Sequence, residues 1–388
     1  MSNEKQTYDV AIIGGGLAGL ALSIQSAKAG YKTILFEKEK YPYHKVCGEY
    51  ISLESWDFLK LLGLPLEQMQ LPIIKQLNVS APDGTLFQQQ LPLGGFGISR
   101  YKLDHELSGL AKQAGVEVIE ETKITDVVFS MNTFKITGGS SSSPPNGGGG
   151  WEGAIVAGSF GKRSNLDVKW NRSFVQQKPN KLNNYIGVKY HIKTSYPADL
   201  ISLHNFENGY CGISQIEDGK YCLCYLTTAD NLKKSNNNIH QMEREVLFQN
   251  PHLKKIFTEA EFLYNTPLTI SQISFDKKSL IENHMLMVGD AGGMITPLCG
   301  NGMSMALHAG KLAFENIHAF LQNKITRSEM ETNYQRQWKK QFAGRIKIGR
   351  IIQRFFGKSF LTNLFIKAFK TFPLLARPLI KRTHGSPF

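Results

Sequence analysis

The feature that most constrains the fold is the stretch VAIIGGGLAGLAL at residues 10–22. Gly14, Gly16 and Gly19 give a G-x-G-x-x-G spacing, and the residues before them read as a short buried strand. A helical pattern follows the glycines, and a second strand, KTILFE, ends at Glu37. A strand, a glycine turn, a helix and a second strand in this order predict a Rossmann-like unit that binds a dinucleotide.

Each part of this unit has a separate physical task. Gly14 permits the tight turn, Gly16 lets the backbone approach a pyrophosphate, and Gly19 lets the helix pack close to the strand. The free N–H groups at the start of the helix attract phosphate. Glu37 is placed to accept hydrogen bonds from the hydroxyls of an adenosine ribose. The alternative is a plain strand–helix connection with a solvated Glu37.

A second glycine-rich loop follows much later in the chain. The segment HMLMVGD reads as a buried strand with Asp290 at its carboxyl end, where open α/β sheets bind their ligands. A helix is predicted to begin near Gly302, and its first N–H groups form a second site for an electron-rich group. NAD and FAD share the first motif, but FAD is long and ends in a ring that also needs hydrogen-bond donors. The second loop therefore favours FAD.

The segment VAIIGGGLAGLALSIQSAKAGYKTILFEK at 10–38, together with GDAGGMITPLCGNGMSMALHAG at 289–310, resembles the FAD-dependent oxidoreductases of the p-hydroxybenzoate hydroxylase-like group. The segment YPYHKVCGEYIS at 41–52 is most similar to the geranylgeranyl reductase family, and residues 98–118 resemble the arginine-bearing helix of the group. The resemblance covers roughly the first 320 residues. It implies an α/β fold, in which a Rossmann-like FAD-binding domain of the GR2 type joins an antiparallel β-sheet substrate domain and a C-terminal helical region.

The resemblance also implies roles for single residues. The glycines of the first motif and Glu37 would hold the ADP half of FAD. Asp290 would bind the ribityl or pyrophosphate portion, and the backbone N–H groups of Gly302 and Met303 would donate to the flavin ring. Arg100 would lie over the pyrophosphate or ribityl region, unless it is an ordinary salt-bridge arginine on the surface.

Three further residues are candidates for the site on the same basis. Cys47 is placed beside the substrate cavity, where a thiol could donate a proton or form a polar wall. A lone cysteine also serves as a small buried apolar residue. Lys45 could pair with the flavin or a phosphate, or simply be solvated. Tyr210 could line the pocket from the sheet.

One segment departs from the pattern of the group. In VAGSFGKRSNLDV, at 156–168, Phe160 stands where the group usually has an aspartate. Because that motif is linked to contacts with FAD and NAD(P)H, the electron donor stays open. We expect either that NAD(P)H docks transiently as the electron donor or that another electron carrier reduces the flavin.

The chain divides into three predicted regions. Residues 182–275 read as antiparallel strands, residues 138–150 as a low-complexity loop, and the tail as basic helices. The predicted regions are a discontinuous FAD-binding domain (1–72, 98–165 and 276–330), a substrate-binding β-sheet domain (73–97 and 166–275) and a C-terminal basic helical region (331–388).

Composition limits the partners. The formal charge of +13 favours an anionic partner, and the tail interleaves apolar and basic residues. The tail is therefore either a pair of packed helices with solvated charges or a platform for peripheral membrane contact. Nucleic acid is not expected, because no known nucleic-acid fold carries these charges. The five cysteines show no CxxC pair, so no metal is expected. The polar start and the lack of an 18-residue apolar run predict a cytoplasmic protein. We expect it to associate with the inner face of a membrane if the tail binds lipid.

The functional hypothesis is that reduced flavin delivers hydride to a C=C bond of a prenyl or other lipid-like substrate. An alternative is a monooxygenase that hydroxylates an aromatic, polyketide or lipid substrate. A halogenase is less well supported, since the four tryptophans do not form a W-x-W-x-I-P segment. A flavin-free escort protein for prenyl or lipid groups is the alternative outside enzymes.

Overall fold

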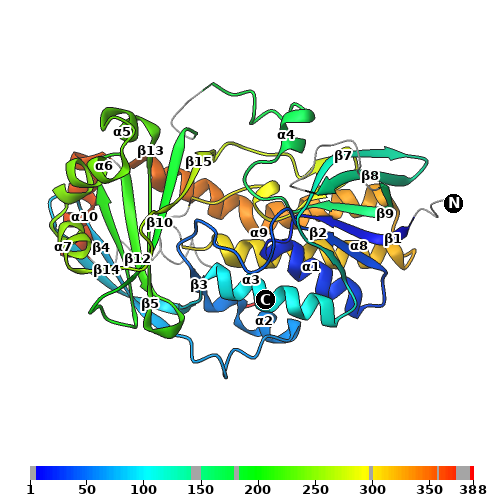
Figure 1. Cartoon of the computed structure of the whole chain (residues 1–388), viewed down its shortest axis with the longest axis horizontal. Helices are drawn as coiled ribbons and strands as arrows, with labels where there is room; N and C mark the ends of the chain where they lie inside the picture. The colour runs from blue at the N-terminus through cyan, green and yellow to red at the C-terminus, as the bar shows by residue number, and fades with distance from the viewer. Residues whose placement is uncertain (1–5, 141–149, 179–182, 297–299, 356–357, 373–384) are drawn as a thin grey trace.

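The computed structural model describes residues 6–140, 150–178, 183–296, 300–355, 358–372 and 385–388. Within these residues the strands form two sheets, of eight and nine strands, at opposite ends of the long axis (Figure 1). The second glycine loop is described except for residues 297–299, and the predicted low-complexity loop at 138–150 lies largely outside the described residues.

The first sheet is built around a parallel core. Its central order is β17-β9-β1-β2-β6, all parallel, with β16 antiparallel at one edge and the β7–β8 hairpin joined through β8 to β9. The bounds are β1 (Thr7–Ile13), β2 (Thr33–Phe36), β6 (Glu117–Ile119), β7 (Thr122–Ser130), β8 (Thr133–Ser140), β9 (Gly150–Gly158), β16 (Ile281–Glu282) and β17 (Met285–Met287).

Side chains of β1 alternate between two hydrophobic cores. Val10 and Ile12 pack with the helices on one face of the sheet, whereas Ala11 and Ile13 pack with the β7–β8 hairpin on the other. The helical face carries α1 (Leu17–Lys28), α3 (Arg100–Gln113) and α8 (Gly302–Leu321). The order of strand, glycine turn, helix and strand predicted for the first unit is observed.

Helices α1 and α8 cross closely because of a glycine. A Cβ atom on Gly310 would lie 2.7 Å from the carbonyl oxygen of Ala18, closer than packed atoms allow. The small residue therefore lets α8 approach the first turns of α1. This contact brings the start of α8, and the loop that precedes it, next to the first glycine turn.

The second sheet is mostly antiparallel, with the order β14-β10-β13-β12-β11-β4-β5-β3 and β15 on β10. Only the pairing of β11 with β4 is parallel among the pairings described. The bounds are β3 (Tyr50–Ser52), β4 (Ile73–Ser80), β5 (Leu86–Gly97), β10 (Tyr185–Lys193), β11 (Leu200–Phe206), β12 (Gly209–Gln215), β13 (Tyr221–Thr228), β14 (Glu261–Phe262) and β15 (Leu268–Ile273).

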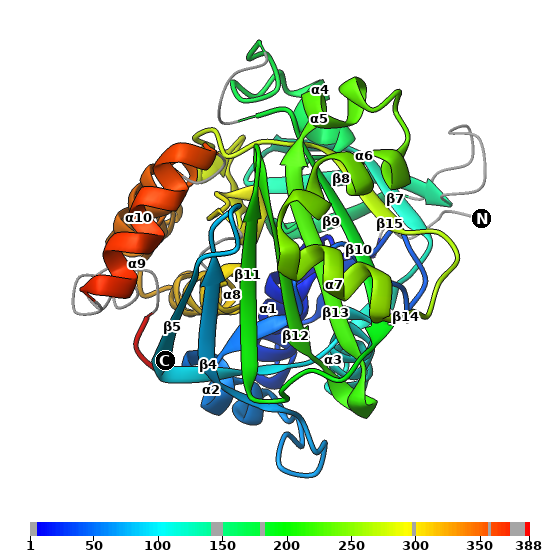
Figure 2. The same cartoon turned by 90° about the vertical axis from the view of Figure 1, so that its left-hand side faces the viewer.

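Part of the region predicted as strands is helical. Between β13 and β14 the chain forms α5 (Ala229–Lys234), α6 (Ile239–Glu245) and α7 (Pro251–Glu259), which cover the outer face of the second sheet (Figure 2). Asn238 and Asn250 cap α6 and α7 through their side chains. These caps are helix-start signals that the alternating pattern of the flanking strands obscures.

The remaining helices complete the predicted architecture. Helix α9 (Arg327–Phe355) packs on α8, and α10 (Ser359–Thr371) lies along β5 at the flank of the second sheet (Figures 1 and 2). The short helices are α2 (Trp56–Leu62) and α4 (Asn165–Lys169), with 3-10 turns η1 (Leu53–Ser55), η3 (Glu217–Gly219), η4 (Leu247–Gln249) and η5 (Gly289–Ala291). The predicted fold class is confirmed, and none of the described helices combines the length and apolar character needed to cross a bilayer.

Candidate active site

One continuous cavity of about 1060 Å³ runs between the two sheets. Both glycine loops line it, so Gly14 and Asp290 face the same space. The other sequence-predicted residues on its wall are Gly16, Glu37, Lys45, Cys47, Arg100, Tyr210, Gly302 and Met303. Gly19 is absent from the wall because it serves packing: a Cβ there would lie 2.1 Å from the carbonyl oxygen of Gly14.

The first loop leaves backbone donors open to the cavity. Gly16 occupies the cap position of α1, and no side chain caps the first N–H groups of this helix. Glu37 is buried and accepts hydrogen bonds from the backbone N–H of Gly15 (2.9 Å) and Glu39 (3.1 Å). Glu37 therefore shapes the turn itself, and each carboxylate oxygen keeps a second lone pair for a ligand.

The second glycine-rich loop also leaves backbone N–H groups open to the cavity. Asp290 lies in η5, and its backbone carbonyl accepts a hydrogen bond from the Lys278 ammonium group (2.8 Å). Helix α8 begins at Gly302 without a side-chain cap from Asn301, and Met303 is buried in its first turn. An uncapped helix start aimed at a cavity favours an electron-rich group there.

Arg100 is part of a buried charge cluster beside the first loop. Its guanidinium makes two hydrogen bonds to Asp104 (2.8 and 2.7 Å), and Lys45 pairs with the same carboxylate at 2.8 Å. Burial would raise the pKa of Asp104, but the charges of Arg100 and Lys45 outweigh it and hold the pKa below its usual range. The cluster therefore keeps two cations on the cavity wall next to Gly16.

Cys47 and Tyr210 lie on the cavity wall from different elements. Cys47 is half-buried in the loop before β3, and its backbone carbonyl accepts a hydrogen bond from the Cys222 thiol (3.2 Å). Tyr210 is buried in β12 among apolar side chains that include Leu226 and Met294. The two side chains thus meet the cavity from the loop and from the sheet.

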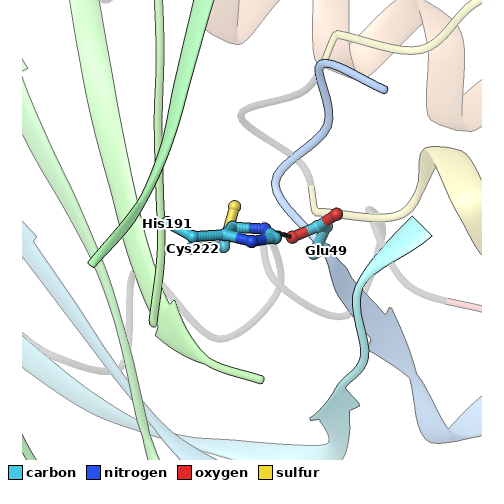
Figure 3. A group of neighbouring side chains, drawn as sticks. All are labelled: Glu49, His191 and Cys222. Atoms are coloured by element: carbon cyan, nitrogen blue, oxygen red, sulfur yellow. Dashed lines mark hydrogen bonds and ion pairs between the residues drawn. The ribbon is translucent and has the colours of Figure 1, made fainter. Parts of the chain in front are cut away.

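Sequence reasoning missed a buried polar group behind Cys47. Glu49, His191 and Cys222 bring three potential metal ligands within 4.8 Å of one another (Figure 3). The carboxylate of Glu49 is already bonded to the Lys189 ammonium (2.5 Å) and to Nε2 of His191 (2.6 Å). Burial raises the pKa of the Cys222 thiol well above its usual value. A neutral thiol and an adjacent ammonium disfavour a cation, so we interpret the group as a hydrogen-bonded network.

The far part of the cavity is apolar. Its wall is formed by side chains from β4, β5, β11 and α10, namely Leu77, Val79, Phe87, Leu91, Ile201, Leu203, Ile366 and Phe369. It is continuous with the part lined by the two glycine loops. The cavity therefore joins a polar slot with two helix starts to a chamber suited to a hydrocarbon.

The residues present fit FAD. The slot has open backbone donors at both glycine loops, and an acidic residue and two cations lie beside the first turn. These features, with the fold, define an FAD-dependent oxidoreductase.

Comparisons with known proteins agree with this assignment to FAD-dependent oxidoreductases. Residues 9–45 match the FAD binding domain family, and the chain is an FAD-dependent oxidoreductase. The digeranylgeranylglycerophospholipid reductase of Methanosarcina mazei is 24% identical over 365 residues, which cover 91% of this chain and 85% of that protein. The conditioned medium factor receptor 1 of Dictyostelium discoideum is 24% identical over 406 residues, covering 100% of this chain and 76% of that protein.

Solved structures share the fold. A geranylgeranyl bacteriochlorophyll reductase-like protein from Thermoplasma acidophilum superposes with a TM-score of 0.76 at 18% identity, covering 94% of this chain and 92% of that chain. The flavin-dependent brominase Bmp2 superposes with a TM-score of 0.77 at 19% identity, covering 96% and 92%.

Proposed function

We propose that this protein reduces C=C bonds in a prenyl or other lipid-like substrate, with FAD as its cofactor. The observation that carries the proposal is the apolar chamber, which opens directly into the slot between the two glycine loops. A hydrocarbon chain gains free energy by leaving water for such a chamber. The reductases among the relatives support the same substrate class.

Each part of the slot has a proposed task. The first glycine turn and Glu37 bind the ADP half of FAD, Arg100 and Lys45 balance its phosphates, and Asp290 binds the ribityl portion. The N–H groups of Gly302 and Met303 donate to the flavin ring. When bound, flavin supplies the hydride for the reduction.

Cys47 and Tyr210 are proposed to contact the substrate. The half-buried thiol is placed to donate or relay the proton that the second carbon of the double bond requires. Tyr210 lines the same cavity from β12. Both roles are predictions that rest on the positions of these residues on the cavity wall.

The experiment that tests the function uses the flavin-loaded protein without oxygen. Chemically reduced protein is mixed with polyprenyl substrates of graded length, and the flavin spectrum and product mass are followed. Reoxidation with a gain of two mass units per double bond is the expected result. A Cys47→Ser variant is compared with Cys224→Ser, since both thiols are half-buried and line the cavity. No reoxidation with any substrate would contradict the proposal.

A monooxygenase is the second candidate. A segment of the chain is 30% identical over 133 residues to the FAD-dependent monooxygenase sdgC of Emericella nidulans, covering 30% of this chain and 28% of that protein. The same assay separates the two: oxygen-dependent reoxidation with an oxygen atom in the product favours the monooxygenase. Adding NADH or NADPH to the oxidised protein tests whether a nicotinamide is the electron donor.

We also propose peripheral contact between α10 and the cytoplasmic face of a membrane. Phe360 and Leu364 are 78% and 57% exposed on this helix, and the exposed Lys367 and Lys370 follow them. Its opposite side places Ile366 and Phe369 on the wall of the apolar chamber. An apolar stripe beside lysines suits an anionic lipid surface, and the chamber beneath is where a lipid chain would enter.

Sedimentation with anionic vesicles tests this contact. A Phe360→Ser/Leu364→Ser double variant is expected to bind at least tenfold less, whereas Met131→Ser, at a 95% exposed position in the β7–β8 turn, leaves binding unchanged. Equal sedimentation of both variants would remove α10 from membrane contact.

A further inference from the structure

A buried lysine on β10 fastens the loop that carries Cys47. Residues 44–49 line the cavity together, and we call them the 44–49 loop. The Lys189 side chain has no exposed surface. Its ammonium group donates to the backbone carbonyl of Lys45 (3.1 Å) and to Oε1 of Glu49 (2.5 Å). One buried cation therefore holds the loop on both sides of Cys47.

The second sheet holds the same loop at two further points. The Cys222 thiol on β13 donates to the backbone carbonyl of Cys47 (3.2 Å). A Cβ atom on Gly187 of β10 would lie 3.1 Å from Cγ1 of Val46, so the missing side chain lets the loop lie directly on the strand. Gly48, in contrast, is exposed, and a Cβ atom there would meet nothing within 4 Å. The sheet therefore fastens the loop from behind, and packing does not hold it at Gly48.

Glu49 joins this attachment to the helix that carries Arg100. Its Oε1 atom also accepts a hydrogen bond from the backbone N–H of Arg100 (2.8 Å), and its Oε2 atom lies 2.6 Å from Nε2 of His191 (Figure 3). Burial would raise the pKa of Glu49, but Lys189 and after it His191 outweigh burial and hold the pKa below its usual range. Burial would lower the pKa of Lys189, but the Glu49 carboxylate raises it above its usual range. Both groups are therefore charged at neutral pH.

Stability alone is a poor reason for this ion pair. A buried ion pair is commonly no more stabilising than apolar side chains that fill the same volume. Glu49 also adopts a φ of 55°, which is unfavourable for a residue with a side chain. Buried charge and a costly backbone conformation are more frequent at functional sites than elsewhere. The group with proposed chemistry that lies next to this pair is the Cys47 thiol.

We propose that Lys189 is a positioning residue for Cys47, and this rests on the proposed C=C reduction. Its ammonium group fixes the chain two residues before and two residues after Cys47, so the thiol keeps one place on the cavity wall. A group that donates a proton must lie within hydrogen-bond reach of the acceptor. A displacement of about 1 Å can slow such a step by about 100-fold. Lys189 is not among the described residues that line the cavity, so it acts through the 44–49 loop.

The reactivity of single thiols tests the positioning without any turnover. Flavin-loaded protein is treated with a bulky maleimide, and peptide mass spectrometry follows the labelling of each cysteine. Lys189→Met is expected to speed the labelling of Cys47 at least tenfold, because the released loop opens toward the reagent. Labelling of Cys211, which is buried on β12, is expected to stay at its wild-type rate.

A neighbouring residue of β10 provides the matched control. Tyr190→Phe removes a buried hydroxyl that is bonded to Glu243 (2.8 Å), in the hydrophobic core on the outer side of the sheet. This variant is expected to label Cys47 at the wild-type rate, because its lost hydrogen bond does not involve the 44–49 loop.

Two results would overturn the positioning role. One is an unchanged labelling rate of Cys47 in Lys189→Met. The other is an equal rise at Cys211, because Lys189 would then serve the stability of the whole sheet. If the single variant does not fold, a Lys189→Met/Glu49→Gln double variant decides in its place, since it leaves no unpaired carboxylate in the interior. The same fast labelling of Cys47 is expected there.

Kinetics separate this inference from the proposed reaction. In single-turnover reduction, Lys189→Met is expected to lower the limiting rate at least tenfold, whereas the substrate concentration that gives half of that rate changes by less than about twofold. An unchanged limiting rate would contradict the positioning role. If the labelling of Cys47 rises as expected while wild-type protein reduces no substrate, the attachment of the loop stands and the proposed reaction fails.

Discussion

Burial of Lys278 makes stability depend on pH in a way that can be measured. Its ammonium group donates to the carbonyl oxygens of Lys162 (2.7 Å) and Asp290 (2.8 Å) and lies 4.5 Å from the centroid of the Phe174 ring. The side chain is buried, and desolvation lowers its pKa from 10.5 to about 8, against the attraction of Asp290 and Asp167. The folded state thus holds this proton less tightly than the unfolded chain does.

The size of the effect follows from the shift in pKa. A shift of about 2.5 units corresponds to about 3 kcal/mol of folding free energy. Between about pH 8 and pH 10.5 the unfolded chain binds more protons, so stability rises with pH through that window. Below about pH 8 both states are protonated, and the full cost of burying the charge is present.

Urea unfolding of wild type and Lys278→Met, each saturated with FAD, measures this contribution. The stability of wild type relative to the variant is expected to increase by about 3 kcal/mol from about pH 7 to about pH 11. A Lys254→Met variant, changed at an exposed position of α7, is expected to give a constant difference. A constant difference for Lys278→Met as well, within about 0.5 kcal/mol, would refute the reasoning, because the charge would then cost nothing in the folded state.

Three other substitutions test the site. Asp104→Asn leaves the Arg100 guanidinium without its buried partner, so urea unfolding should show a loss of about 3 kcal/mol; no loss would mean that the pair is effectively solvated. Gly310→Val would force α8 away from Ala18, and thermal unfolding should show a lower midpoint together with weaker FAD binding by titration calorimetry. Asp290→Ala should weaken FAD binding by about 10-fold to 100-fold, the loss of one charge-assisted hydrogen bond, as measured by flavin fluorescence; unchanged binding would place the ligand elsewhere.

The nucleotide-binding parts of the fold are readable in sequence because their determinants are local. The glycines of the first motif and Glu37 are each specified by spacing and by neighbours in the chain. The convergence of the two loops was expected from the length of the proposed ligand. Its structural cause, the contact of Gly310 with Ala18, joins distant segments, and the pattern of α8 alone does not reveal it.

The buried polar group around Glu49 shows why the rest of the site was missed. Lys189 and His191 alternate along β10, a pattern typical of a solvated strand face. Both are buried because Glu49 and the 44–49 loop lie against that face, and such a tertiary contact leaves no periodic signal. In the segment KVCGE the cysteine was the predicted site residue, whereas Glu49 at its end makes the buried contacts. The roles of the predicted site residues and the domain boundaries remain predictions.

The two halves of the slot are made at very different moments of synthesis. Gly14 emerges early from the ribosome, whereas Asp290 and α8 follow only after the whole second sheet has been translated. A nascent chain therefore has no complete flavin cradle until its last quarter is exposed, and the cofactor can join both loops only late in folding. Vitamin supply during expression should then control how much protein escapes proteolysis, because ligand bound to the native state adds directly to its stability.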